Sequence, residues 1–134
     1  DSWMLPALLP QHPDLAREML RYRLRTLEGA RANARAEGLP GASFAWESGA
    51  TGKETLKSDV FRHGRHVSGD VALGARQYWE ATGSEEWLRE AWPMLRATAE
   101  NWAARARPDG KGGYLVRGVT TPDELAGQVD HSAW

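Results

Sequence analysis

Apolar residues recur at helical spacing in three long segments of this 134-residue chain, and that pattern constrains its fold most. The first segment runs from a predicted N-cap at Asp14 to a stop at Gly38. A shorter apolar run, residues 3–9, precedes it. The apolar positions of the first segment are Leu15, Met19, Tyr22, Leu27 and Ala30.

The other two helical segments lie in the second half of the chain. One is predicted over residues 70–82, with Ser68 as its cap and Gly83 as its end. The next begins after Ser84, and Pro93 inside it predicts a kink or a break because proline lacks an N–H. The packing candidates of these two segments are Val71, Leu73, Tyr78, Trp79, Trp87, Leu88, Met94, Leu95, Thr98 and Trp102.

Between the helical segments, residues from about 41 to 66 show no sustained period and are rich in Gly, Ser, Thr and His. A loop this long inside a compact domain is usually functional or disordered, and Phe44, Trp46 and Phe61 argue for order. A short β-like run covers residues 114–119. The sequence therefore predicts an all-α chain with antiparallel helical neighbours, a long irregular loop and a short hairpin.

Charge and hydropathy exclude several classes of partner. The chain carries 17 Lys and Arg against 18 Asp and Glu, and no apolar run approaches the length of a membrane helix. We therefore expect neither nucleic acid nor a membrane as a partner. The chain has no Cys, which excludes disulfides and thiolate catalysis. Because it begins with Asp1 rather than Met, its compartment stays open between cytoplasmic and secreted.

The irregular loop contains an aromatic residue next to a carboxylate, Trp46-Glu47. A flat ring can cover the C–H face of a sugar while a neighbouring carboxylate binds two of its hydroxyls. In the alternative interpretation, which spacing alone favours, Trp46 plugs the core and Glu47 caps another element.

A second motif, Pro122-Asp123-Glu124, places two carboxylates after a residue that fixes the backbone. In a partly apolar pocket beside Trp rings, the pKa of Glu124 would rise, and the acid could then protonate a leaving oxygen. Asp123 could bind a hydroxyl or cap a helix. The alternative is that both acids merely form the acidic first turn of a helix. The residues alone favour neither interpretation over the other.

Six motifs follow one another along the chain, at residues 1–6, 22–27, 41–48, 66–70, 77–83 and 118–124. In this order they resemble the catalytic domain of glycoside hydrolase family 65, which includes disaccharide phosphorylases, acid trehalases and related α-glucosidases. Three positions depart from the family pattern. Ala45 replaces a proline, Leu125 replaces an aromatic residue, and Gly64 stands where the family usually has an acid.

The resemblance implies an (α/α)6 barrel of helical hairpins, of which residues 1–134 are expected to be a fragment truncated at both ends. It also implies inverting cleavage of an α-glucosidic bond in a disaccharide or glucosyl conjugate, with Glu124 as the general acid. Trp46 and Glu47 are expected to contact the glucosyl unit. His66 and Asp123 lie in motifs near that pocket and are further candidates for binding substrate.

The attacking group separates two enzyme hypotheses. In an inverting hydrolase it is a water activated by a carboxylate, and in a phosphorylase it is phosphate itself. Residues 124–130, E-L-A-G-Q-V-D, resemble the sequence pattern of the trehalase-like hydrolases more than that of the phosphorylases, so hydrolysis is expected. The alternative is an inverting disaccharide phosphorylase with inorganic phosphate as co-substrate.

No cofactor is implied, and the pair His63 and His66 has no further ligand set for a metal ion. The expected partners are a small disaccharide or glucosyl conjugate and the remaining barrel segments of the same polypeptide, with a homodimer as a candidate assembly. A hypothesis from a different class is a non-catalytic helical module whose Trp residues pack or bind a partner.

Overall fold

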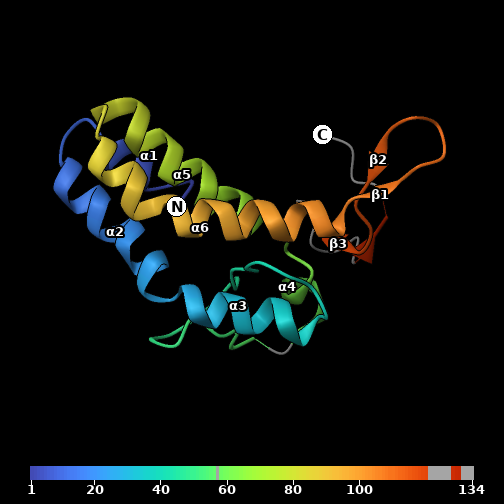
Figure 1. The fold of residues 1–134 in the computed structure, drawn as a ribbon. Helices are drawn as coiled ribbons and strands as arrows, with labels where there is room; N and C mark the ends of the chain where they lie inside the picture. The colour runs from blue at the N-terminus through green and yellow to red at the C-terminus, as the bar shows by residue number, and fades with distance from the viewer. Residues whose placement is uncertain (57, 121–127, 131–134) are drawn as a thin grey trace.

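The computed structural model describes residues 1–56, 58–120 and 128–130 (Figure 1). These residues are mainly helical, which confirms the predicted all-α class with its long irregular loop and short hairpins. The helices are α1 (Leu5–Leu8), α2 (Pro13–Arg25), α3 (Leu27–Ala36), α4 (Asp59–Arg62), α5 (His66–Thr82) and α6 (Glu85–Arg105). The strands are β1 (Arg107–Pro108), β2 (Tyr114–Leu115), β3 (Val119–Thr120) and β4 (Gln128–Val129).

Helices α5 and α6 form an antiparallel hairpin around a tight turn (Figure 1). Gly83 ends α5 in the left-handed conformation, with φ 63°, and Ser84 caps α6 by accepting a hydrogen bond from Trp87 N. The Trp87 ring then packs edge-on against Tyr78, and its Nε1 donates to the Ala75 carbonyl at 2.9 Å. The indole is thus fully buried with its polar atom bonded.

The hydrophobic core lies where α1 and α2 pack against this hairpin. Leu5, Leu20, Val71 and Met94 are fully buried there together with Trp87. A Cβ on Gly74 would lie 2.9 Å from Leu5 Cδ2 and 3.2 Å from Leu20 Cδ2, so the glycine lets the two leucines approach α5 closely.

The first predicted helix is divided into two, which corrects its boundaries. Thr26 separates α2 from α3, with its hydroxyl bonded back to the Tyr22 carbonyl at 2.8 Å. Helix α2 begins at Pro13 with His12 as its N-cap, not at Asp14. Leu15, expected in the core, is 56% exposed because it lies on the outer face of α2.

Helix α5 also differs from its prediction. It begins at His66, four residues early, so that Ser68 lies inside the helix and does not cap it. Leu73 is 45% exposed, whereas the core prediction is confirmed for Val71 and Tyr78. In α6 the helix runs through Pro93 without a break (Figure 1).

Two small antiparallel hairpins follow α6. Strands β1 and β2 pair across a turn in which the Asp109 carboxylate accepts hydrogen bonds from Lys111 N and Gly113 N. Strands β3 and β4 pair Val119 with Val129 and Thr120 with Gln128. Among the described residues, no helix has the length and apolar character needed to cross a membrane.

Candidate functional site

Trp46 lies on the irregular loop between α3 and α4 and is half-buried. Its ring centroid is 5.2 Å from that of Phe61 and 5.1 Å from that of His66, which meets it edge-on at 88°. A Cβ added at Gly64 would lie 2.7 Å from Trp46 Cε3. The indole therefore rests on the glycine backbone, and an acid at position 64 would compete for the space of the ring.

Trp46 and His66, two of the predicted site residues, line the same pocket, of about 270 Å³. The pocket is formed by the N-terminal residues, α2, the irregular loop and the start of α5. Its lining residues are Asp1, Ser2, Trp3, Arg23, Trp46, His66, Val67 and Asp70.

Charged groups face each other on the wall of this pocket. Arg23 Nη2 lies 2.8 Å from Asp1 Oδ2, and both side chains are largely buried, at 14% and 7% exposure. Burial lowers the pKa of Arg23, and the neighbouring Tyr22 and Asp70 partly offset that shift. An aromatic face, an imidazole, a guanidinium and two carboxylates together offer the groups that hold a sugar ring and its hydroxyls.

Hydrogen bonds tie the loop to the helix that carries His66. Ser68 Oγ is buried in α5 and accepts a hydrogen bond of 2.9 Å from Phe44 N. Tyr22 Oη on α2 lies 2.7 Å from Ser48 Oγ and donates to the carbonyls around it. The loop is therefore held on either side of Trp46, at Phe44 from α5 and at Ser48 from α2.

The other predicted site residues are Glu47, Asp123 and Glu124, and of these the structure describes Glu47. Glu47 is exposed, does not line the Trp46 pocket, and its carboxylate has no hydrogen bond within the described part of the chain. Asp123 and Glu124 lie outside the described residues. Thr120, just before them, donates from N to the His63 carbonyl at 3.0 Å and from Oγ1 to the Val60 carbonyl at 2.5 Å.

Sequence reasoning missed three charged residues of the pocket, Asp1, Arg23 and Asp70. Each belongs to a segment that carries the family resemblance, at residues 1–6, 22–27 and 66–70. The motifs were recognised, but the site prediction did not include Asp1 or Arg23, and Asp70 was predicted only as the start of a helix. Among the residues that the structure describes, no group of three or more His, Cys, Asp or Glu could hold a metal ion.

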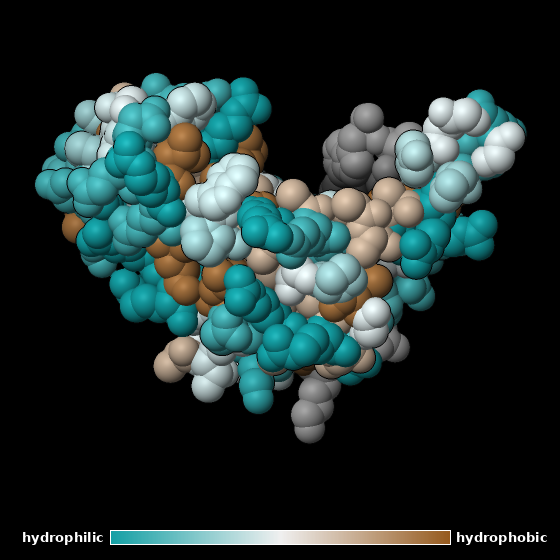
Figure 2. Space-filling model, viewed as in Figure 1, coloured by the Kyte–Doolittle hydropathy of each residue, from teal (hydrophilic) through white to brown (hydrophobic). Residues whose placement is uncertain are grey.

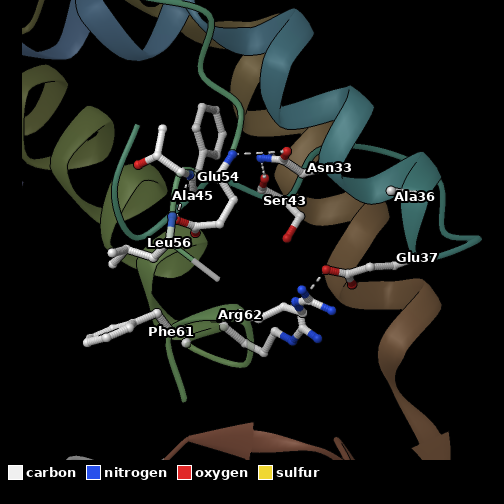
Figure 3. Close-up of a pocket in the computed structure, with 13 residues that line it drawn as sticks. Asn33, Ala36, Glu37, Ser43, Ala45, Glu54, Leu56, Phe61 and Arg62 are labelled. Atoms are coloured by element: carbon white, nitrogen blue, oxygen red, sulfur yellow. Dashed lines mark hydrogen bonds and ion pairs between the residues drawn. The ribbon is translucent and has the colours of Figure 1, made fainter. Parts of the chain in front are cut away.

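A second pocket, of about 420 Å³, lies behind the loop, between α3 and α4 (Figure 3). Glu37 at its edge pairs with Arg65 at 2.7 Å and also with Arg105. Burial and the neighbouring Arg105 lower the pKa of Arg65, and the bond to Glu37 opposes this. Glu54 also lines this pocket (Figure 3), and its carboxylate accepts a hydrogen bond from Trp46 N.

Comparison with known proteins gives a match along the whole chain. Residues 1–134 match the family model described as "Glycosyl hydrolase family 65 central catalytic domain". A kojibiose hydrolase of Flavobacterium johnsoniae is 43% identical over 139 residues, covering 100% of this chain and 20% of the relative. A protein-glucosylgalactosylhydroxylysine glucosidase of Gallus gallus is 40% identical, covering 100% of this chain and 20% of the relative.

A kojibiose phosphorylase of Halothermothrix orenii is 32% identical over 151 residues, covering 100% of this chain and 19% of that protein. The chain thus spans about one fifth of the length of the curated relatives it matches.

Proposed function

The chain belongs to glycosyl hydrolase family 65, and from this premise we propose that the full-length protein cleaves an α-glucosidic bond with inversion. The chain contributes part of the (α/α)6 catalytic domain. Its substrate is a disaccharide or glucosyl conjugate of the class named by its relatives, such as kojibiose. The observation that carries the proposal is the pocket in which Trp46 meets His66, Arg23 and Asp70.

In this proposal the pocket holds the glucosyl unit. Trp46 stacks on the C–H face of the ring, and the carboxylate of Asp70 accepts hydrogen bonds from sugar hydroxyls. His66 supplies a further polar contact at the edge of the ring. Glu47, on the same loop as Trp46, reaches the glucosyl unit from its exposed position.

Glu124 is the proposed general acid. Its proton passes to the glycosidic oxygen as the bond from that oxygen to the anomeric carbon breaks, and the leaving group departs as a neutral alcohol. The nucleophile attacks the anomeric carbon from the opposite face, which inverts its configuration. Thr120 and Gln128 support this role, because they pair on either side of the stretch that contains Glu124. Thr120 is bonded to Val60 and His63, the sequence neighbours of Phe61 and Gly64, which lie against the Trp46 ring.

Water is proposed as the nucleophile. The relatives named hydrolase and glucosidase are 43% and 40% identical to this chain, against 32% for the kojibiose phosphorylase. The alternative, phosphorolysis, is supported by the same family match and by the phosphorylase relatives.

Product analysis tests the proposal. The full-length protein is incubated with kojibiose, with and without inorganic phosphate, and the products are followed by NMR. We expect glucose, first released as the β-anomer, at a rate independent of phosphate. Glucose 1-phosphate formed only with phosphate would replace hydrolysis by phosphorolysis, and first release of the α-anomer would contradict inversion.

A substitution at the general acid tests its residue assignment. Glu124→Gln should lower kcat by about 10³-fold or more because the amide cannot donate a proton to the leaving oxygen, while binding of glucose persists. Glu80→Gln, a surface change in an i,i+4 pair with Arg76, is the matched control and should retain wild-type turnover. Near-normal turnover of Glu124→Gln would remove Glu124 from this role.

A further inference from the structure

We propose that Glu54 is the positioning residue for the Trp46–Glu47 segment and thereby for binding of the glucosyl unit. The inference rests on the proposed function, because it assigns a role at the same pocket. Glu54 itself does not line that pocket and acts only through the backbone of the loop.

The Glu54 carboxylate accepts hydrogen bonds from four main-chain N–H groups. Oε2 accepts a hydrogen bond of 2.8 Å from Trp46 N. Oε1 accepts from Glu47 N at 3.3 Å, from Thr55 N at 3.1 Å and from Leu56 N at 3.2 Å. Both oxygens are therefore bonded to main-chain N–H groups, and two of those groups belong to the residues expected to hold the sugar.

Further bonds make Glu54 part of a closed frame. Ser48 and Glu54 form an antiparallel bridge, and Thr55 donates from both N and Oγ1 to the Glu47 carbonyl at 3.1 Å. The Glu47 backbone is thus held at its N–H by Glu54 and at its carbonyl by Thr55.

Asn33 connects this frame to α3, as Figure 3 shows. Its Oδ1 accepts from Glu54 N at 3.4 Å, and its Nδ2 donates to the carbonyls of Ser43 and Gly52 at 3.1 and 3.2 Å. The position of Trp46 therefore depends on a rigid helix through a short chain of bonded groups. A misplacement of about 1 Å at a binding group can cost about 10²-fold in rate, so such a frame affects turnover.

A carboxylate is required at position 54 because every group around it is a donor. It is acceptor-only, with two oxygens for several N–H groups, and its charge strengthens bonds from N–H donors. A glutamine would keep one acceptor oxygen and turn an NH₂ group toward N–H donors. Glu54→Gln should then release either Trp46 N or the group of N–H donors at Oε1.

The test measures kcat and KM of the full-length protein with kojibiose for four forms: wild type, Glu54→Gln, Trp46→Ala and the double variant. Glu54→Gln should lower kcat/KM by about 10- to 100-fold, mainly through a higher KM, without changing the pH profile. In the Trp46→Ala background the same change should cost clearly less than in the wild type, because Trp46 is absent and only the positioning of Glu47 remains to be lost.

Equal costs in both backgrounds would show a general structural role and overturn the proposal, as would a changed pH profile. Glu54→Asp keeps the charge and both acceptor oxygens and should lie between wild type and Glu54→Gln. If Glu54→Gln does not fold, the Asp variant is tested in the same cycle. The matched control is Glu80→Gln, which removes an exposed carboxylate far from the loop.

The two proposals fail in different ways. A wild type that cleaves no α-glucoside would overturn the proposed function, and the role of Glu54 in glucosyl binding would fall with it. A wild type that cleaves kojibiose beside a Glu54→Gln variant of equal kcat/KM would overturn only the role of Glu54. Fluorine NMR of 5-fluorotryptophan protein adds a direct readout, in which Glu54→Gln should shift the Trp46 signal and leave that of buried Trp87 in place.

Discussion

At the scale of single residues, the packing of Trp46 depends on the absence of a side chain at Gly64. The indole is confined by Phe61 and His66, and the glycine backbone forms the remaining support. The ring packs against Phe61 and His66 and also lines the pocket, so both interpretations of Trp46 that the sequence left open stay predictions.

Gly64→Ala should displace this ring. The added Cβ would lie 2.7 Å from Trp46 Cε3 and 3.2 Å from the Phe61 carbonyl, and neither neighbour is the far end of a flexible side chain. We expect a loss of about 1–3 kcal/mol in the free energy of unfolding, as for overpacked sites, and a KM for kojibiose raised about tenfold. Urea denaturation and steady-state kinetics of the full-length protein measure the two effects.

Gly49→Ala is the control for this substitution. Gly49 lies on the same loop and has no atom within 4 Å of an added Cβ, so stability and KM should stay close to wild type. If both alanine variants behave alike, close packing at position 64 does not position Trp46.

At the scale of secondary-structure elements, ion pairs join α2 to α6. Glu90 on α6 accepts from Arg21 Nε at 2.8 Å and from Arg17 Nη2 at 2.9 Å. The bonds from Arg21 and then Arg17 hold the pKa of Glu90 below its ordinary value, against the opposing effect of burial. These contacts lie beside the core and fix the register between the two helices.

Acid should weaken this link. Because the pKa of Glu90 is lower in the folded state than in the unfolded chain, its stabilisation is present above the ordinary carboxyl pKa of about 4.5 and is lost as pH falls below it. At pH 7, Glu90→Gln should cost about 0.5–1 kcal/mol, the range for partly exposed pairs. Denaturant melts of wild type and variant at pH 7 and pH 3 measure the difference, which should shrink at pH 3. A difference that is the same at both pH values would contradict this account.

Helical periodicity predicted where most elements lie but not where they break. Gly83 and Ser84 carry local cap chemistry, and the α5–α6 turn was predicted correctly from them. At Thr26 the helix breaks where the hydroxyl bonds back to the Tyr22 carbonyl, and inside α5 Ser68 is engaged by a tertiary contact, the bond from Phe44 N to its Oγ. Such long-range bonds leave no local signal in the sequence.

The same limit applies to the candidate site. Trp46 and His66 were predicted because their motifs resemble a known family, and the structure brings their rings into contact. Arg23 was not predicted as a site residue, since periodicity does not show that it lies buried beside Asp1 and Phe44. Glu54 was not singled out, because its function depends on the N–H groups that face it and not on its own spacing.

At the scale of the whole molecule, large apolar side chains remain exposed on residues 1–134. Trp3 is 94% exposed, Tyr114 72%, Met4 63% and Trp92 59%. Figure 2 shows apolar side chains among hydrophilic ones over the seam between α2 and α6. A helical hairpin in an (α/α)6 barrel packs on further hairpins, and these exposed residues are candidates for such contacts.

Residues 1–134 expressed alone should therefore associate. We expect light scattering to show particles larger than a monomer, and melting to be broad, because exposed apolar faces bind each other when the neighbouring hairpins are absent. The full-length protein should melt cooperatively under the same conditions. Trp92→Gln with Tyr114→Gln, two exposed positions outside the Trp46 pocket, should reduce association of the isolated chain. A monodisperse, cooperatively melting wild-type fragment would instead support the independent helical module that the sequence left as an alternative.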